Sequence, residues 1–218
     1  MMKFYFLITL ALNILLISCS ANEIVNLRTA KDIVKNYYES GKYDEEMNEI
    51  IIDAKEKFNK VEIKKSASGG SAVIFDVDDT ALSNYEVSKR LDFGYDKKII
   101  DDWVLSAQLP AIKQTKELYD HLKSKNVKLI FLTGRFIEEY DATFKNLISQ
   151  GYTGFDTLIV RNEQEKKINS QIFKSSVREN LTHAGYDIIG TVGDQWTDLN
   201  GPYTGIQIKV PNYLYQIK

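Results

Sequence analysis

Three carboxylates stand within four residues at Asp76, Asp78 and Asp79, and Thr80 follows them at once. They come at the end of an apolar run that begins at Ala72. Like charges packed this closely repel and raise one another's pKa unless a cation neutralises them. A hard divalent ion that takes oxygen ligands, above all Mg²⁺, is the natural partner. The spacing therefore predicts a nucleophile and an acid–base group that share one phosphate and one metal ion.

Two more polar segments follow apolar runs further along the chain. They are Thr133, Gly134 and Arg135 after residues 127–132, and Gly193, Asp194 and Asp198 after residues 188–192. In an open parallel sheet the active site lies at the carboxyl ends of the strands. We therefore expect these two segments and the aspartate cluster to converge on one site.

Apolar runs alternate with amphipathic segments over most of the chain, which predicts an α/β fold with a doubly wound parallel sheet. The expected strands are residues 72–77, 127–132, 158–160, 188–192 and 206–210, and the expected helices are residues 110–125, 137–150 and 170–184. Residues 24–39 and about 47–61 have the apolar spacing of two further helices, joined by a turn near Gly41. The Ser- and Gly-rich residues 66–71 are expected to form a loop.

The N-terminus has the pattern of a secretory signal. Lys3 precedes an apolar run from Phe4 to Ile17, which is short for a membrane span and typical of a signal-peptide core. Cys19, the one cysteine of the chain, follows at a position that resembles a bacterial lipobox. That resemblance implies cleavage before Cys19, acylation of its thiol, and an envelope lipoprotein anchored in the lipid bilayer. Ser20 in the next position implies the outer membrane if the source is Gram-negative, with the protein facing the periplasm; an ordinary secretory signal with an incidental cysteine is the alternative.

The expected organisation is therefore a signal peptide (1–18), a tether with N-terminal helices (19–65), and a core (66–218) with an insertion at about 84–109. The net charge of −2 over 218 residues gives no reason to expect a nucleic-acid polymer as partner.

The amino-acid sequences of these segments resemble those of the haloacid dehalogenase (HAD) superfamily of phosphohydrolases. The similarity covers residues 72–215 and is strongest in FDVDDTALSN (75–84), LTGR (132–135), GYTGFDTLIVRN (151–162) and GDQWTDL (193–199). These segments look like the acid phosphatase branch, subfamily IIIB, which holds the class B and class C acid phosphatases and the plant vegetative storage proteins. The resemblance implies a Rossmann-like core and makes the insertion a small cap.

The resemblance also implies unequal roles for the aspartates. Asp76 matches the nucleophile that forms an aspartyl-phosphate, and Asp78 matches the general acid and base. Asp194 would complete a Mg²⁺ site with a carboxylate oxygen of Asp76 and the backbone carbonyl of Asp78. Asp198 would hold a metal-bound water or a lysine. Asp79 has no such role and is expected to accept backbone hydrogen bonds in the turn.

Phosphate binding is expected from three further residues. The hydroxyl of Thr133 and the amides around Gly134 would bind phosphoryl oxygens, and Lys174 matches the family's charge-balancing lysine. Lys166 and Lys167 are the alternatives, but they lie in a run of mixed charge that is typical of a solvated surface.

The expected function is a Mg²⁺-dependent acid phosphatase that acts on small phosphomonoesters, such as nucleoside monophosphates or aryl phosphates. The aromatic residues Tyr85, Phe93, Tyr95 and Trp103 of the insertion, with Trp196, could stack on such a leaving group or could simply pack the cap onto the core. Two alternatives stay open: a phosphotransferase with the same intermediate, and a storage or binding protein that has kept the fold. The oligomeric state is not predicted.

Overall fold

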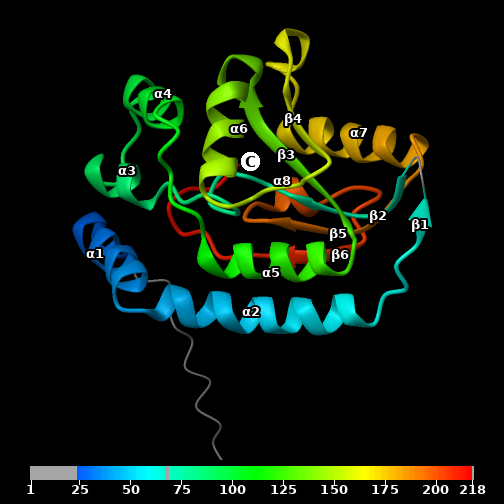
Figure 1. Ribbon diagram of the computed structural model, residues 1–218. Helices are drawn as coiled ribbons and strands as arrows, with labels where there is room; N and C mark the ends of the chain where they lie inside the picture. The colour runs from blue at the N-terminus through cyan, green and yellow to red at the C-terminus, as the bar shows by residue number, and fades with distance from the viewer. Residues whose placement is uncertain (1–23, 67–68, 218) are drawn as a thin grey trace, which may run out of the picture.

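The computed structural model describes residues 24–66 and 69–217, and within them a six-stranded sheet forms the centre of the molecule (Figure 1). The strand order is β4-β3-β2-β5-β6, all parallel, and the short β1 pairs antiparallel with β2. The strands are β1 Lys65–Ser66, β2 Gly69–Phe75, β3 Lys128–Phe136, β4 Thr157–Arg161, β5 Tyr186–Gly193 and β6 Ile206–Lys209. The α-helices are α1 Leu27–Glu39, α2 Lys42–Asn59, α3 Tyr85–Arg90, α4 Lys97–Leu105, α5 Lys113–Ser124, α6 Tyr140–Ser149, α7 Ser170–His183 and α8 Trp196–Leu199, with 3₁₀ turns at Ile137–Glu139 and Glu163–Glu165. The predicted α/β class with a doubly wound parallel sheet is confirmed.

Helices cover both faces of the sheet because successive side chains of a strand point in opposite directions. Val73 and Phe75 of β2 belong to the larger core cluster, to which α2 and α5 contribute. Ala72 and Ile74 belong to the smaller cluster, which is completed by Phe173 of α7. Figure 1 shows α5 along one face with α2 beside it, and α7 on the opposite face.

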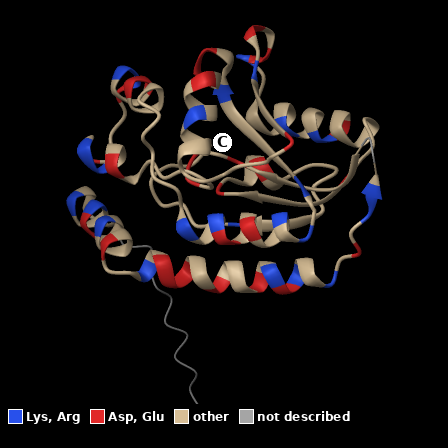
Figure 2. Cartoon of the chain, viewed as in Figure 1, with Lys and Arg blue, Asp and Glu red and all other residues tan. Residues whose placement is uncertain are grey.

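The N-terminal helical extension packs on the core through one face of α2. Its buried residues, Met47, Ile51, Ala54 and Phe58, recur every three or four positions. Phe58 reaches β5 at Gly190, where a Cβ atom would lie only 2.4 Å from the Phe58 ring. The opposite face of α2 carries both signs of charge and is exposed (Figure 2), as the mixed composition predicts.

The predicted loop at residues 66–71 is wrong in its second half. Gly69, Gly70 and Ser71 belong to β2 and are buried, and β1 and β2 form a hairpin whose Gly70 has a φ of +97°. A Cβ atom at Gly69 would lie 2.1 Å from the carbonyl oxygen of Gly185. The glycines therefore allow two chain segments to pack closely together. Glycines in such a strand and glycines in a loop cannot be told apart from composition alone.

The helix expected at residues 110–125 begins only at Lys113. Before it, the Leu109 N–H donates to the Asn146 side chain and the Ala111 N–H to the Gln150 side chain, each at 2.9 Å. These side chains, from α6 and from the residue that follows it, hold the backbone extended up to the first turn of α5. The insertion at residues 84–109 contains α3 and α4, which form the small cap.

Cys19 and the whole predicted signal peptide lie outside the described residues. Within residues 24–66 and 69–217, no helix combines the length and the apolar character needed to cross a membrane. The domain boundaries at residues 18 and 65 stay predictions.

Candidate active site

The carboxyl ends of β2, β3 and β5 bring the three predicted segments together. Asp76 follows β2, and its N–H donates to the carbonyl of Val192 on β5 at 2.9 Å. Gly134 lies near the end of β3, and Asp194 follows β5. The same cavity is lined by Asp76, Asp78, Gly134, Lys174, Asp194 and Asp198.

A buried lysine joins two of these aspartates. The Lys174 ammonium lies 2.6 Å from Oδ1 of Asp76 and 2.6 Å from Oδ1 of Asp198, and all three side chains are buried. Burial alone would lower the pKa of Lys174, but Asp198 and Asp76 together raise it above its ordinary value. The second carboxylate oxygen of Asp198 accepts the Gln195 N–H at 2.9 Å, which fixes Asp198 at the start of α8. Of the two predicted tasks for Asp198, the structure therefore shows the contact with the lysine.

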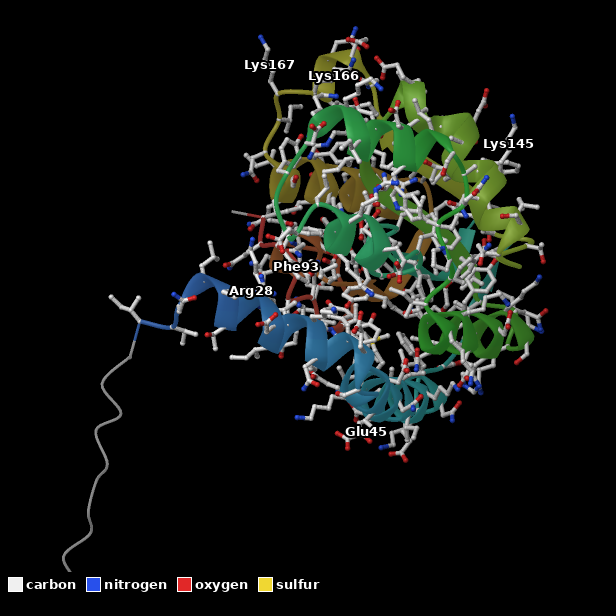
Figure 3. The ribbon with its side chains drawn as sticks, turned by 90° about the vertical axis from the view of Figure 1, so that its left-hand side faces the viewer. Arg28, Glu45, Phe93, Lys145, Lys166 and Lys167 are labelled. Atoms are coloured by element: carbon white, nitrogen blue, oxygen red, sulfur yellow. The ribbon has the colours of Figure 1, made fainter. Side chains whose placement is uncertain are left out.

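The alternative lysines lie at the surface. The Lys166 ammonium pairs with Glu138 at 2.5 Å and with Glu163 at 2.6 Å. Figure 3 shows Lys166 and Lys167 at the outer edge of the molecule, pointing away from the core.

Asp198 occupies the space that a side chain at position 193 would need, so glycine is the residue that fits there. A Cβ atom at Gly193 would lie 2.5 Å from the Cβ of Asp198 and 2.6 Å from its Oδ2. The glycine that opens the third segment thus allows the pairing of Asp198 with Lys174.

Asp78 is held by an arginine that sequence analysis left without a role. Arg135 donates through Nε to Oδ2 of Asp78 at 2.9 Å and through Nη2 to Oδ1 at 2.7 Å. The Asn84 amide donates to the same Oδ1 at 2.9 Å. Burial would raise the pKa of Asp78, but Arg135 and the Asn84 hydrogen bond bring it below its ordinary value. Asp78 is therefore stabilised as a carboxylate in this arrangement.

Asp79 takes the structural place expected for it. Its Oδ1 accepts the Asn84 N–H at 2.8 Å, and its own backbone has a φ of 55°. Burial raises the pKa of Asp79 to about 7.

A metal ion fits the charge and the donors of this site. Oxygen atoms of Asp76, Asp194 and Asp198 lie within 4.8 Å of one another, and all three residues are buried. Burial raises the pKa of Asp76 despite the opposing effect of Lys174, and it raises the pKa of Asp194 to about 7. The site thus holds more negative charge than its cations offset, and its all-oxygen donor set suits Mg²⁺. Asp198 uses both oxygens for Lys174 and Gln195, so Asp76 and Asp194 remain as the side chains that would hold the ion.

Three side chains orient Asp194. The amides of Gln195 and Asn212 each donate to its Oδ2 at 2.6 Å, and the Thr80 hydroxyl donates to its Oδ1 at 3.3 Å. Oδ1 is therefore the less engaged of the two Asp194 oxygens and the one with more capacity left for an ion. Mutation of groups that orient a metal ligand in this way typically lowers metal affinity by about 10- to 100-fold.

The two residues expected to bind phosphate after β3 have different surroundings. Gly134 lines the cavity, and a Cβ atom there would meet only Arg161 Nε, at 3.9 Å. No strained backbone angle or packing contact requires this glycine, and its role in phosphate binding stays a prediction. Thr133 is fully buried, and its hydroxyl accepts the Arg135 N–H at 3.2 Å. Its role in phosphate binding stays a prediction.

A cavity of about 750 Å³ opens above the aspartates, and much of its wall is apolar. Of the five aromatic residues considered for the substrate, Phe93 and Tyr95 line this cavity. Tyr85 stacks on Tyr38 of α1, and Trp103 packs against the larger core cluster. Trp196 is 54% exposed and lines a smaller neighbouring pocket. Both of the predicted alternatives, contact with the cavity and packing of the cap, therefore occur.

The residues that sequence analysis missed are those that orient the aspartates. Arg135 and Asn84 stood within the quoted segments, and that position was the available signal. Asn212 has no such signal, because it lies past the last strand in a stretch without a motif.

Comparison with known proteins agrees with this geometry. A model of subfamily IIIB of the HAD superfamily, the acid phosphatases, matches residues 9–218. The chain belongs to this family. The resemblance in the motifs is thereby confirmed.

Plant proteins of the family are similar over much of the chain. Acid phosphatase 1 of Solanum lycopersicum is 30% identical over 85% of this chain and 74% of its own length. A stem 31 kDa glycoprotein of Glycine max is 35% identical over 66% of this chain, and vegetative storage protein 1 of Arabidopsis thaliana is 32% identical over 66%. These alignments cover 59% of the soybean protein and 54% of the Arabidopsis protein.

The fold is also that of solved acid phosphatases. The structure of the class C acid phosphatase from Bacillus anthracis with tungstate bound superposes with a TM-score of 0.68 at 21% identity, over 88% of this chain and 87% of that one. At that identity the likeness concerns the fold, which is the HAD fold expected from the sequence.

Proposed function

We propose that this member of the acid phosphatase family is a Mg²⁺-dependent phosphomonoesterase that works through an aspartyl-phosphate on Asp76. The observation that carries the proposal is the buried contact of Asp76 with Lys174 at 2.6 Å on the floor of a cavity that Asp78 and Asp194 share. A carboxylate that is shielded from water and placed beside a fixed cation can attack a bound phosphate group.

The first step forms a bond between an Asp76 oxygen and phosphorus and breaks the bond between phosphorus and the ester oxygen. Lys174 offsets the charge of the phosphate and of Asp76, and the open side of Gly134 leaves room for phosphoryl oxygens. The leaving oxygen takes a proton from Asp78. Mg²⁺ held by Asp76 and Asp194 would neutralise part of the phosphate charge.

In the second step a water molecule gives a proton back to Asp78 and attacks phosphorus, which releases phosphate and restores Asp76. Both oxygens of Asp78 bind Arg135 in this arrangement, which suits this second step, where Asp78 acts as a base. For Asp78 to act as an acid in the first step, one of these two contacts must open.

The proposed substrates are phosphomonoesters with an aryl or nucleoside leaving group. Phe93 and Tyr95 offer aromatic surface in a cavity of about 750 Å³, a size that accepts a drug-sized leaving group. The test is phosphate release from a panel of aryl, nucleoside and alkyl phosphates across pH 4–8, with Mg²⁺ and with EDTA. We expect release from the first two classes and loss of activity in EDTA. No release from either class would refute the proposed function.

Two alternatives have a specific basis. A phosphotransferase would use the same intermediate and differ only in the acceptor, so product analysis with an added alcohol separates the two reactions. A storage protein is suggested by the similarity to vegetative storage protein 1. Against it stand the complete set of aspartates and the lysine that the catalytic roles need.

We also propose that Cys19 is acylated and anchors the protein in the cell envelope, facing the periplasm or the cell exterior. The lipobox-like sequence before Cys19 supports this. The test compares the wild type with Cys19→Ala by acyl labelling in a bacterial host. Equal labelling of both proteins would refute the anchor.

A further inference from the structure

One side chain of α1 contacts both segments that wall the cavity. The Tyr38 ring is stacked between Tyr43, at 4.8 Å, and Tyr85, at 4.7 Å with an angle of 15°. Its hydroxyl oxygen accepts the N–H of Tyr213 at 3.2 Å. Tyr85 opens α3 of the cap, and Tyr213 belongs to the C-terminal segment 212–217. Tyr38 therefore connects the cap and the C-terminal segment, both of which line the cavity.

Both contacts lie one residue away from an asparagine that orients an aspartate of the site. Asn84 precedes Tyr85 and donates to Asp78 at 2.9 Å. Asn212 precedes Tyr213 and donates to Asp194 at 2.6 Å. Because neighbouring residues share a rigid peptide plane, a backbone shift at either tyrosine would move the adjacent asparagine.

The segments that Tyr38 contacts also supply cavity wall. The cap side contributes Val87, Ser88, Phe93, Gly94 and Tyr95, and the C-terminal side contributes Leu214, Tyr215 and Ile217. With the phosphate group placed among the aspartates, a large leaving group would contact both sides of this cavity. The distance between the two sides therefore matters most for large leaving groups.

Ion pairs along α1 reinforce the position of the cap. Oε1 of Glu39 accepts from the Tyr85 hydroxyl at 3.0 Å and from the Lys89 ammonium at 2.5 Å. Lys31 pairs with Asp92 at 2.5 Å, at the far end of α3. Figure 1 shows α1 running beside α3, at the edge of the molecule. Exposed ion pairs add little stability, but two of them at separate points restrict how the cap can rotate on α1.

We propose that Tyr38 is a positioning residue that sets the spacing of the two cavity walls and so selects for phosphomonoesters with a large leaving group. The proposal rests on the proposed phosphomonoesterase function. It assigns to the N-terminal extension a part in substrate selection, beyond covering the sheet.

The kinetic test compares the wild type, Tyr38→Ala, Tyr38→Phe and Tyr186→Ala. Tyr186 is a matched control, since it is a half-buried tyrosine at the start of β5, the end of the strand opposite the site. We expect Tyr38→Ala to raise KM for 4-nitrophenyl phosphate about tenfold, equivalent to about 1.4 kcal/mol, while KM for glycerol 2-phosphate changes less than about twofold. Tyr38→Phe keeps the stacked ring against Tyr85 but loses the hydroxyl that accepts the Tyr213 N–H, so its KM for 4-nitrophenyl phosphate should lie between those of the wild type and Tyr38→Ala. Equal KM changes for both substrates, or the same selective change in Tyr186→Ala, would overturn the proposal.

Hydrogen–deuterium exchange tests the same idea without relying on activity. In Tyr38→Ala the amides of residues 85–95 and 212–217 should exchange faster than in the wild type, while those of β2 and β5 keep their rates. Unchanged exchange in both segments would refute the positioning role. If the wild type releases no phosphate from either substrate, the proposed function fails, and the exchange result still decides whether Tyr38 couples the two walls.

Discussion

Replacing Lys174 with methionine tests the charge balance of the site. Methionine has a similar length but no charge, so Asp76 and Asp198 would face each other with oxygens within 4.8 Å. At an effective dielectric constant of about 20, two unit charges at that distance repel by about 3.5 kcal/mol. Removing one partner of a buried ion pair costs a similar amount, about 3–5 kcal/mol. We therefore expect Lys174→Met to lose about 3 kcal/mol of unfolding free energy in EDTA.

The assay is urea unfolding followed by circular dichroism, in EDTA and in millimolar Mg²⁺. Mg²⁺ should restore part of the lost stability, because a bound cation replaces some of the missing positive charge. The rate of phosphate release should still fall by about 10²- to 10³-fold, since the cation beside the reacting phosphate is lost. Lys166→Met is the matched control, because Lys166 makes two ion pairs at the surface, and it should match the wild type in both assays. A Lys174→Met protein as stable and as active as the control would refute this reasoning.

Three further predictions follow from single contacts. Asn212→Ala removes a 2.6 Å hydrogen bond to Asp194 and should weaken Mg²⁺ activation about 10- to 100-fold, measured as the Mg²⁺ concentration for half-maximal phosphate release; unchanged activation would contradict the orienting role. Gly134→Val places side-chain atoms in the open space of the cavity and should raise KM with little change in thermal unfolding, whereas an unchanged KM would show that no ligand uses that space. Asn146→Ala leaves a buried N–H and a buried C=O without their partners and should cost about 2 kcal/mol or more in urea unfolding, while loss of less than about 0.5 kcal/mol would show that water replaces the amide.

The sequence was sufficient for the residues that perform the proposed chemistry. Asp76 and Asp194 directly follow apolar strands, Asp78 comes two residues after Asp76, and the carboxyl ends of parallel strands lie on one side of the sheet. Their convergence is therefore a consequence of local pattern and fold class. The identity of Lys174 needed the family resemblance, because a lysine in a helix has no pattern of its own.

The residues that orient the site could not be found this way. Tyr38 and Tyr213 are 175 residues apart, and their contact depends on how α1 and the C-terminal segment pack together. Gly69 to Ser71 have the composition of a loop but lie in a strand, because the structure there needs space for the turn at Gly185. Each of these features is a contact between segments that lie far apart in the sequence. Local composition does not predict such contacts.

The role of Asp76 as nucleophile is tested most directly by comparing phosphate release by the wild type and by Asp76→Asn in Mg²⁺. Asparagine keeps the shape of the side chain but carries no charge. Burial raises the pKa of Asp76, which means that the fold disfavours its charged form, so the variant should unfold at the same urea concentration as the wild type or a higher one. We predict a loss of about 10³-fold or more in rate, because an amide cannot form the acyl phosphate. Equal rates for the two proteins would contradict the assignment of Asp76 as the nucleophile.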